Sequence, residues 1–283
     1  MATDWIIPGW PAPARVHATV TTRDGPDFVH ASPYGFNIGR RCGDDPAGVA
    51  RNRAFLRDAL ALPSEPCWLH QVHATCCVGI DAPVLTTGRE ADAIVARAHA
   101  SGPHPPEREG WGAGEGSAET DREADAAVTR SPGVVLAIQT ADCLPVLFRA
   151  QDGSEIAAAH AGWRGLSAGV LEATLGSMRT PREHVIAWLG PAIAAESYEV
   201  GDEVRAAFVA RDSAAASAFS ATRPGHWLCD LYELARRRLR TAGVTRIFGG
   251  GFDTFTDPHL QSYRRDRPRS GRMASLIWID PER

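Results

Sequence analysis

The 283-residue sequence lacks the features that mark membrane, secreted and nucleic-acid-binding proteins. No apolar run approaches the roughly 20 residues that a membrane-spanning helix needs. The first residues show no basic segment followed by an apolar one, as a secretory signal would. A net charge of -4 and a pI near 6.2 offer no excess of positive charge for nucleic acid. We therefore expect a cytoplasmic protein whose partners are small molecules, with no membrane and no nucleic acid among them.

Cysteine is too sparse for a disulfide scaffold, because only six are spread over the chain. The Gly-x-Gly-x-x-Gly phrase of dinucleotide-binding folds is absent, and so is a regular βαβ rhythm. The ten histidines include no His-x-His pair of the kind that multicopper oxidases use. The remaining composition, 44% hydrophobic and 23% charged, is typical of a globular enzyme or binding protein.

Short apolar segments alternate with amphipathic patterns along the chain. Asp44 and Asp45 before Pro46 predict a helix start. Leu171, Leu175 and Met178 mark the buried stripe of one later helix, and another is expected over 230–240. Strands are predicted over 16–22, 67–72, 134–139, 144–148, 156–159, 185–189, 244–248 and 275–279. This mixture predicts an α+β fold with mixed sheets. The length suits one large domain or two ordinary ones.

One segment of the chain is nearly duplicated. Residues 89–97 (READAIVAR) recur as 122–130 (READAAVTR), and the connection over 98–121 is rich in Gly, Pro, Ser and Glu. Because only two copies exist, the pattern is not a solenoid repeat. We interpret the duplicated segment as an insertion and predict a flexible surface loop over 98–121.

One cysteine and two histidines stand at the ends of predicted strands. Cys143 lies in 140–145 (TADCLP), His160 in 158–165 (AAHAGWRG), and His73 in 70–73 (HQVH). Reactive groups are commonly displayed where a rigid strand becomes a loop. A thiolate and two imidazoles are also the donors of three-coordinate zinc sites that keep a fourth position open. Each residue alone equally fits a buried core cysteine, a core histidine or a surface histidine.

Two chemistries fit these residues. In the first, Cys143 and both histidines hold a metal that activates water or polarises the substrate, with Asp142 as general base or as a partner of the ligands. In the second, His160 activates Cys143 as the nucleophile of an acyl or amide hydrolase. Arg164, just before a predicted helix, suits a phosphate or carboxylate, and a structural salt bridge is its alternative.

The chain resembles the laccase-domain family, whose members are labelled polyphenol oxidase, YfiH-like or purine nucleoside phosphorylase. The phrases that carry the resemblance span most of the chain: 21–23, 37–39, 43–46, 52–53, 71–73, 140–145, 160–165, 190–193, 198–201 and 262–266. The central phrases are long and specific, so the resemblance implies the family's four-layer α/β/β/α sandwich. It also implies a single domain of this family over 1–283.

The resemblance also implies an activity and a cofactor. The implied site is zinc held by His73, Cys143 and His160, with copper as the alternative metal because copper binds nitrogen and sulfur ligands more tightly. The implied reactions are phosphorolysis of adenosine, inosine and methylthioadenosine, and deamination of adenosine. For phosphate we predict Arg164, then Arg23 and Arg265, with Gln71 as a polar contact.

Three other functions compete with this one. They are a Cys143/His160 amide hydrolase that edits peptidoglycan precursors, a copper-dependent polyphenol oxidase, and a non-catalytic metal-binding or partner-binding protein. Where the family often carries cysteine, this chain has Glu196, Asp253 and Thr256. No extra metal or redox role rests on those positions, and the three predicted ligands are retained.

Overall fold

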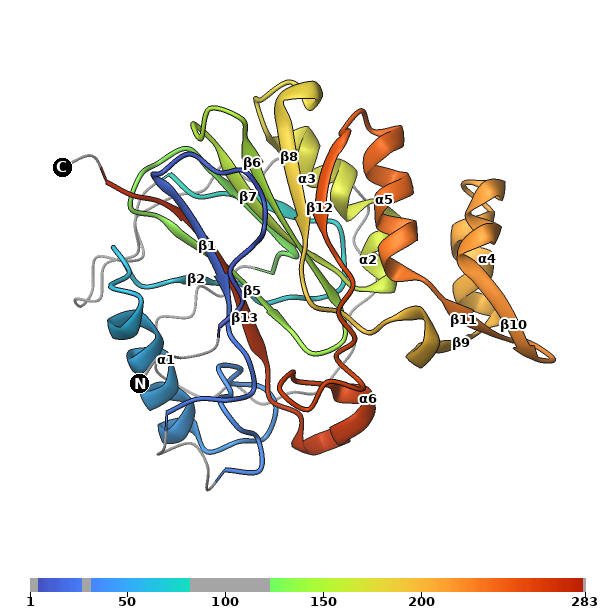
Figure 1. Ribbon diagram of the computed structural model, residues 1–283, viewed down its shortest axis with the longest axis horizontal. Helices are drawn as coiled ribbons and strands as arrows, with labels where there is room; N and C mark the ends of the chain where they lie inside the picture. The colour runs from blue at the N-terminus through green and yellow to red at the C-terminus, as the bar shows by residue number, and fades with distance from the viewer. Residues whose placement is uncertain (1–4, 27–31, 82–122, 282–283) are drawn as a thin grey trace.

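The computed structural model describes residues 5–26, 32–81 and 123–281 (Figure 1). The predicted loop over 98–121 and the first copy of the duplicated segment lie outside them. The single-domain organisation over 1–283 stays a prediction. The strands are β1 (Val16–Val20), β2 (Cys67–Trp68), β3 (Cys77–Gly79), β4 (Ala126–Thr129), β5 (Val135–Thr140), β6 (Leu144–Ala150), β7 (Ile156–Ala161), β8 (Val185–Leu189), β9 (Glu199–Gly201), β10 (Phe219–Arg223), β11 (His226–Cys229), β12 (Arg246–Gly249) and β13 (Met273–Ile279). The α-helices are α1 (Pro46–Ala59), α2 (Trp163–Ala168), α3 (Val170–Ser177), α4 (Asp202–Val209), α5 (Leu231–Thr241) and α6 (Tyr263–Asp266).

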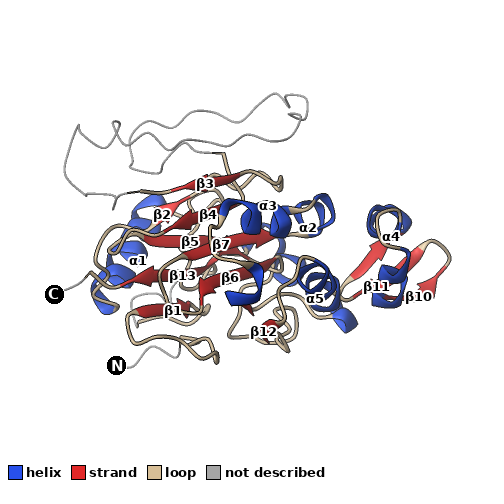
Figure 2. Ribbon diagram, turned by 90° about the horizontal axis from the view of Figure 1, so that it is seen from above, coloured by secondary structure: helices blue, strands red, loops and turns tan. Residues whose placement is uncertain are grey.

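Two mixed sheets stack face to face, with helices on both outer faces (Figure 2). One sheet has the order β1-β13-β5-β2, and the other has the order β12-β8-β6-β7-β4-β3. Each combines parallel and antiparallel neighbours, such as β2 parallel to β5 and β6 antiparallel to β7. The layers run from α1 through the two sheets to α2, α3 and α5, so the predicted α+β fold with mixed sheets is confirmed.

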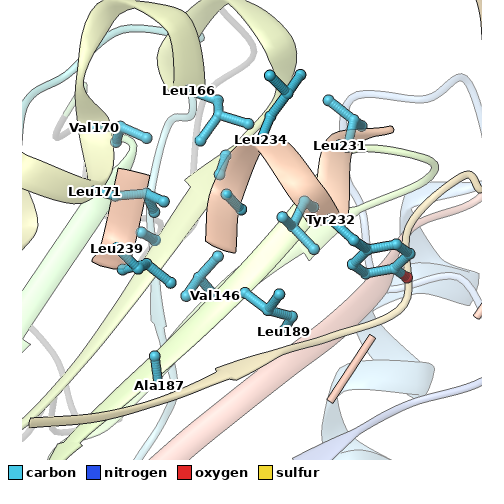
Figure 3. Packing of buried hydrophobic residues seen from close by; sticks show 14 of the residues in the cluster. Val146, Leu166, Val170, Leu171, Ala187, Leu189, Leu231, Tyr232, Leu234 and Leu239 are labelled. Atoms are coloured by element: carbon cyan, nitrogen blue, oxygen red, sulfur yellow. The ribbon is translucent and has the colours of Figure 1, made fainter. Parts of the chain in front are cut away.

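Each interface between layers has its own hydrophobic cluster. Leu56 of α1 packs with Trp68 and Leu276 on the outer face of the smaller sheet. Ile138 and Leu147 meet between the two sheets. On the outer face of the larger sheet, leucines of α2, α3 and α5 cover β6 and β8 (Figure 3). Each fully buried side chain of this size contributes about 1.5–3 kcal/mol, so all three interfaces hold the strand ends in place.

The sequence correctly predicted where α1 begins, but it did not predict the break between α2 and α3. Asp45 caps α1, and its carboxylate accepts the backbone N–H groups of Ala47 and Gly48. The helix predicted around Leu171 is instead two helices, α2 and α3, separated at Gly169. Gly169 has a φ of 112°, a conformation that favours glycine and that ends a helix.

Near the site, β2 and β7 differ from their predicted ranges, and β4 was not predicted. β2 ends at Trp68, so the chain leaves the sheet before His73. β7 extends to Ala161 and contains His160, which pairs with Pro145 of β6. The second copy of the duplicated segment supplies β4, which lies between β7 and β3 in the larger sheet. Residues 124–129 are buried and therefore part of the core, not of the predicted insertion.

A small third sheet lies beside the four layers. Its order is β10-β11-β9, and it packs with α4 at the edge of the molecule (Figure 1). Val204 and Phe208 of α4 join the same hydrophobic cluster as α5, which fixes this lobe to the helical layer. Among the described residues, no helix has both the length and the apolar character needed to cross a membrane.

Candidate metal and substrate site

The three predicted donors lie together at one end of the sandwich. His73 comes from the loop after β2, Cys143 from the turn between β5 and β6, and His160 from β7. Their donor atoms all lie within 4.8 Å of one another. The Cys143 Sγ is 3.9 Å from the His73 Nε2, and the two imidazole rings meet edge to face with centroids 4.7 Å apart. Segments that are distant in the sequence thus form one three-donor group.

Strained backbone helps to aim two of the residues at this site. His73 has a φ of 61° and Asp142, next to Cys143, has a φ of 80°. Side-chain-bearing residues adopt this left-handed region at a cost of about 1–3 kcal/mol. The cost is offset by surrounding contacts, because hydrogen bonds hold both loops, as described next.

Asp125 holds two of the donors and was missed by the sequence analysis. Its carboxylate is fully buried and accepts the backbone N–H groups of Val72, His73 and Ala74 at 3.2, 3.0 and 2.6 Å. It also lies 2.8 Å from the His160 Nδ1. This hydrogen bond fixes the ring and leaves the His160 Nε2 for a ligand, the usual arrangement behind a metal-bound histidine. The available signal was an acid at the start of an alanine-rich strand, in the segment interpreted as an insertion.

The carboxylate of Asp142 is also engaged by the protein. Its Oδ1 accepts the Thr254 hydroxyl at 2.7 Å, and its Oδ2 accepts the Arg264 backbone N–H at 2.6 Å. Its carbonyl accepts the Ile193 N–H at 3.0 Å. Asp142 therefore ties the Cys143 turn to two neighbouring loops, which is the geometry of a positioning residue.

Charge couples Cys143 to the histidines. Burial alone would raise the pKa of the Cys143 thiol, but the His160 ring, and then His73, more than offset it and lower the pKa to about 6. Burial would likewise lower the pKa of His160, yet Cys143 and then Asp125 raise it to about 9. These opposite shifts favour a thiolate at Cys143 beside an imidazolium at His160, and a cation held by both residues would displace the imidazolium proton.

The donor set and the space around it fit a metal ion. A Cβ built on Gly162 would lie 3.0 Å from the Cys143 Sγ, 3.1 Å from the His73 Cδ2 and 3.6 Å from the His160 Cε1. Glycine thus keeps open the space beside all three donors. One thiolate and two imidazoles suit zinc or copper. In the described part of the chain, this is the one group of His, Cys, Asp or Glu side chains that could hold a metal.

A cavity of about 700 Å³ opens beside the three donors. This volume lies within the usual range for small-molecule sites. Five arginines face it, and three of them stack on aromatic rings that also line it. Arg164 lies 4.4 Å from the Trp163 ring, Arg264 lies 5.3 Å from Tyr198, and Arg272 lies 5.8 Å from Tyr263. The other two are Arg40 and Arg41.

These arginines have no carboxylate partner within the described ranges. Arg264 donates to the Glu199 carbonyl and Arg272 to the Ser270 and Gly271 carbonyls, so stacking and backbone contacts hold these guanidinium groups without neutralising their charge. Asp142 is the one acidic side chain that faces the cavity, and both of its oxygens are already bonded. The cavity therefore carries positive charge that suits an anionic ligand.

Of the four predicted phosphate contacts, two line the cavity and two do not. Arg164 faces the cavity. Gln71 does too, but its amide is paired with the backbone N–H and C=O of Gln139 at 2.7 and 2.8 Å. Arg23 and Arg265 do not line the cavity and instead hold Asp266, while Arg265 also donates to several backbone carbonyls. Spacing along the chain could not reveal the contact of Arg23 with Asp266, because 243 residues separate the two.

The fold and site define a class of four-layer α/β/β/α proteins with a group of three donors that could hold a metal beside a cationic cavity. The chain belongs to the family described as multi-copper polyphenol oxidoreductase laccase, whose model matches residues 17–103 and 107–280. Relatives named purine nucleoside phosphorylase include one from Xylella fastidiosa, 46% identical over 283 residues and covering 97% of each chain. Another, YfiH of Escherichia coli, is 44% identical over 276 residues, or 97% of this chain and 98% of the relative.

Solved structures agree with this assignment. A Neisseria meningitidis protein of 38% identity matches with a TM-score of 0.80 over 98% of this chain and 100% of its own. YlmD from Geobacillus stearothermophilus, 26% identical, matches with a TM-score of 0.75 over 98% of this chain and 96% of its own. The overall fold of this chain is therefore shared with these solved structures.

Proposed function

We propose that this protein is a zinc-dependent purine nucleoside phosphorylase acting on adenosine, inosine and methylthioadenosine, with adenosine deaminase activity at the same site. The observation that carries the proposal is the three-donor group of His73, Cys143 and His160 opening directly on the arginine-lined cavity. The names of relatives 44–46% identical to this chain support the phosphorylase reaction.

The chain's own residues are suited to both substrates of phosphorolysis. In this reaction a phosphate oxygen bonds to the sugar C1′, the bond from C1′ to the purine nitrogen breaks, and the base leaves with a proton. Arg40, Arg41, Arg164, Arg264 and Arg272 would bind and orient the phosphate. Binding both reactants side by side removes much of the entropic barrier to their reaction.

His73, Cys143 and His160 would hold zinc, and copper is the alternative. When bound, the ion supplies a Lewis acid and lowers the pKa of water toward neutrality, which suits replacement of the adenosine amine by a water oxygen with loss of ammonia. Asp125 orients the His160 ring, and Asp142 positions the Cys143 turn. We assign Asp142 this positioning role in place of a general base.

A second candidate function is an amide hydrolase with Cys143 as nucleophile and His160 as its base. The observation that favours it is that the Cys143 Sγ lies within 4.8 Å of the ligand nitrogens of His160 and His73, and these two rings lower the pKa of the thiol. A polyphenol oxidase has less support, because the described residues offer one three-donor site. Copper there would stand alone, whereas dioxygen reduction by multicopper oxidases uses several coppers.

We also propose a cytoplasmic location. All six cysteines are free, as a reducing compartment would keep them. The expected partners are a purine nucleoside and phosphate, which the cavity's size and charge suit.

Product analysis tests the proposal. Purified protein and Cys143→Ala are incubated with inosine or adenosine, with and without phosphate, and the metal content of each sample is measured. We expect phosphate-dependent hypoxanthine and ribose 1-phosphate from the zinc-loaded parent protein and a loss of at least about 100-fold in the variant. Absence of both free base and deaminated product from zinc-loaded protein would reject the proposal and favour the hydrolase.

A further inference from the structure

Thr140 has a buried hydroxyl that the protein leaves without a hydrogen bond. Seven threonines of the described residues are buried, and Thr140 is 1% exposed. Six of them have a hydrogen-bond partner within the chain, as Thr129 does with the Ile80 carbonyl at 2.6 Å. The Thr140 Oγ1 has none. Buried hydroxyls are almost always paired, because leaving one unpaired costs free energy.

The position of Thr140 suggests where its partner comes from. It is the last residue of β5 and lines the cavity, within the continuous stretch that leads to Asp142 and Cys143. The other buried hydroxyl without a partner that lies in a strand, that of Ser275 in β13, does not line the cavity. An unpaired polar group at a cavity wall can be satisfied by a ligand.

The chemistry of the cavity indicates which ligand group this is. Its charged donors are the arginines, and they suit phosphate. Leu69, Ala141 and Ile193 form an uncharged part of the lining and are almost fully buried. A neutral hydroxyl that both donates and accepts suits the neutral reactant, whose ring nitrogens, amine and sugar hydroxyls need such partners.

We propose that the Thr140 hydroxyl hydrogen-bonds the purine nucleoside and helps to determine specificity for it. This inference rests on the proposed phosphorylase function. It gives Thr140 a role in nucleoside binding that is separate from metal binding and from phosphate binding.

The test compares Thr140→Val, which keeps the shape and removes the hydroxyl, with Thr140→Ser, which keeps the hydroxyl. For Thr140→Val we expect the KM for inosine to rise about tenfold, as the loss of one buried hydrogen bond predicts. The KM for phosphate and the zinc content should stay at parental values. The melting temperature should not fall, because an unpaired hydroxyl is lost. Thr140→Ser should restore most of the inosine KM.

Two control variants separate binding from folding. Thr129→Val removes a paired hydroxyl far from the cavity and should lower the melting temperature with the inosine KM unchanged. Ser275→Ala removes an unpaired hydroxyl outside the cavity and should change neither the melting temperature nor the inosine KM. If Thr140→Val behaves like Thr129→Val, the hydroxyl is structural and the inference is overturned while phosphorolysis stands. A parental protein without nucleoside turnover overturns both.

Discussion

Two residues at the site adopt backbone conformations that are unfavourable for residues with side chains, and these conformations help to place the metal donors. His73 and Asp142 adopt left-handed backbone conformations, and both are held by hydrogen bonds that converge on buried or half-buried carboxylates. Asp125 alone accepts three backbone N–H groups and orients His160. Strained backbone of this kind concentrates at functional sites. The arrangement is therefore better explained by the demands of the three donors than by the stability of the loops.

Gly162 tests whether the space beside the donors is needed for a metal. Gly162→Ala would place a methyl group 3.0 Å from the Cys143 Sγ, closer than such contacts normally occur. We expect bound metal to fall well below one ion per chain while the circular dichroism spectrum is unchanged. Gly176→Ala, on a helix position with open space, is the control and should gain about 0.5–1 kcal/mol of stability. Full metal content in Gly162→Ala would contradict the assignment.

The arginines give a second prediction at this scale. Arg41→Gln removes a cavity cation and should raise the KM for phosphate about tenfold, with the inosine KM unchanged, because a charged hydrogen bond is worth about 1.5–3 kcal/mol. Arg23→Gln breaks the pair with Asp266 and should lower the free energy of unfolding by about 1–3 kcal/mol, with the phosphate KM unchanged. Steady-state kinetics measures the KM for phosphate of each variant, and chemical denaturation measures its free energy of unfolding. A higher KM for phosphate in Arg23→Gln, with no change in Arg41→Gln, would favour Arg23 as the phosphate contact, as the sequence analysis predicted.

The three donors could be predicted from their residue types and the residues next to them in the sequence. Contacts with residues distant in the sequence could not. The thiol and imidazole donors stood out because each lies where an apolar segment ends. Asp125 did not, since its role depends on β4 lying against β7, which no local pattern encodes. The sequence also did not show that Arg23 and Arg265 lie outside the cavity lining, because the contact of Arg23 with Asp266 forms only in the folded chain.

At the scale of elements, the antiparallel pair β6 and β7 brings Cys143 and His160 together. Leu144 lies opposite Ala161 and Pro145 opposite His160, so the turn before β6 meets the end of β7. The apolar runs predicted both strands, although β7 proved longer than its apolar run because His160 is paired and buried inside it. The break at Gly169 was not predicted, because the apolar stripe continues across it.

Glu155, just before β7, anchors the far end of that strand. Its buried carboxylate accepts the Arg179 and Thr180 backbone N–H groups, the Thr180 hydroxyl and the Arg130 guanidinium. Burial raises the pKa of Glu155, but these hydrogen bonds more than offset it and lower the pKa below its usual 4.5. The lowered pKa means that its stabilisation is complete above about pH 4.5 and is lost as the pH falls through the folded-state value.

Glu155→Gln should therefore be less stable than the parent protein by about 2 kcal/mol at pH 7. The difference in the free energy of unfolding should narrow as the pH falls below 4.5, because the parent protein then loses the charge of the Glu155 carboxylate, which the variant lacks at every pH. Urea unfolding at a series of pH values measures this. Glu199→Gln, in an exposed pair with Arg223, is the control and should change little. A gap that stays constant with pH would mean that the charge of Glu155 is not what stabilises the strand.

At the scale of the whole molecule, the layered fold leaves the site at an end of the sandwich. Hydrophobic clusters fill all three interfaces between layers. The cavity lies where the loop after β2, the β5–β6 turn, α2 and α6 meet. Mixed strand and helix patterns predicted the fold class, whereas the four layers followed from the family resemblance. The small third sheet was not predicted, since β10 is mostly exposed and β9 and β11 are only three and four residues long.

The central claim is that bound metal at His73, Cys143 and His160 is required for phosphorolysis of nucleosides in the neighbouring cavity. The most direct test strips the purified protein of metal with a chelator, restores zinc in steps, and measures phosphate-dependent release of hypoxanthine from inosine at each step. We predict turnover that rises in proportion to bound zinc and levels off at one ion per chain. Undiminished turnover in the stripped protein, abolished by alkylation of Cys143, would contradict the claim and identify Cys143 as a nucleophile.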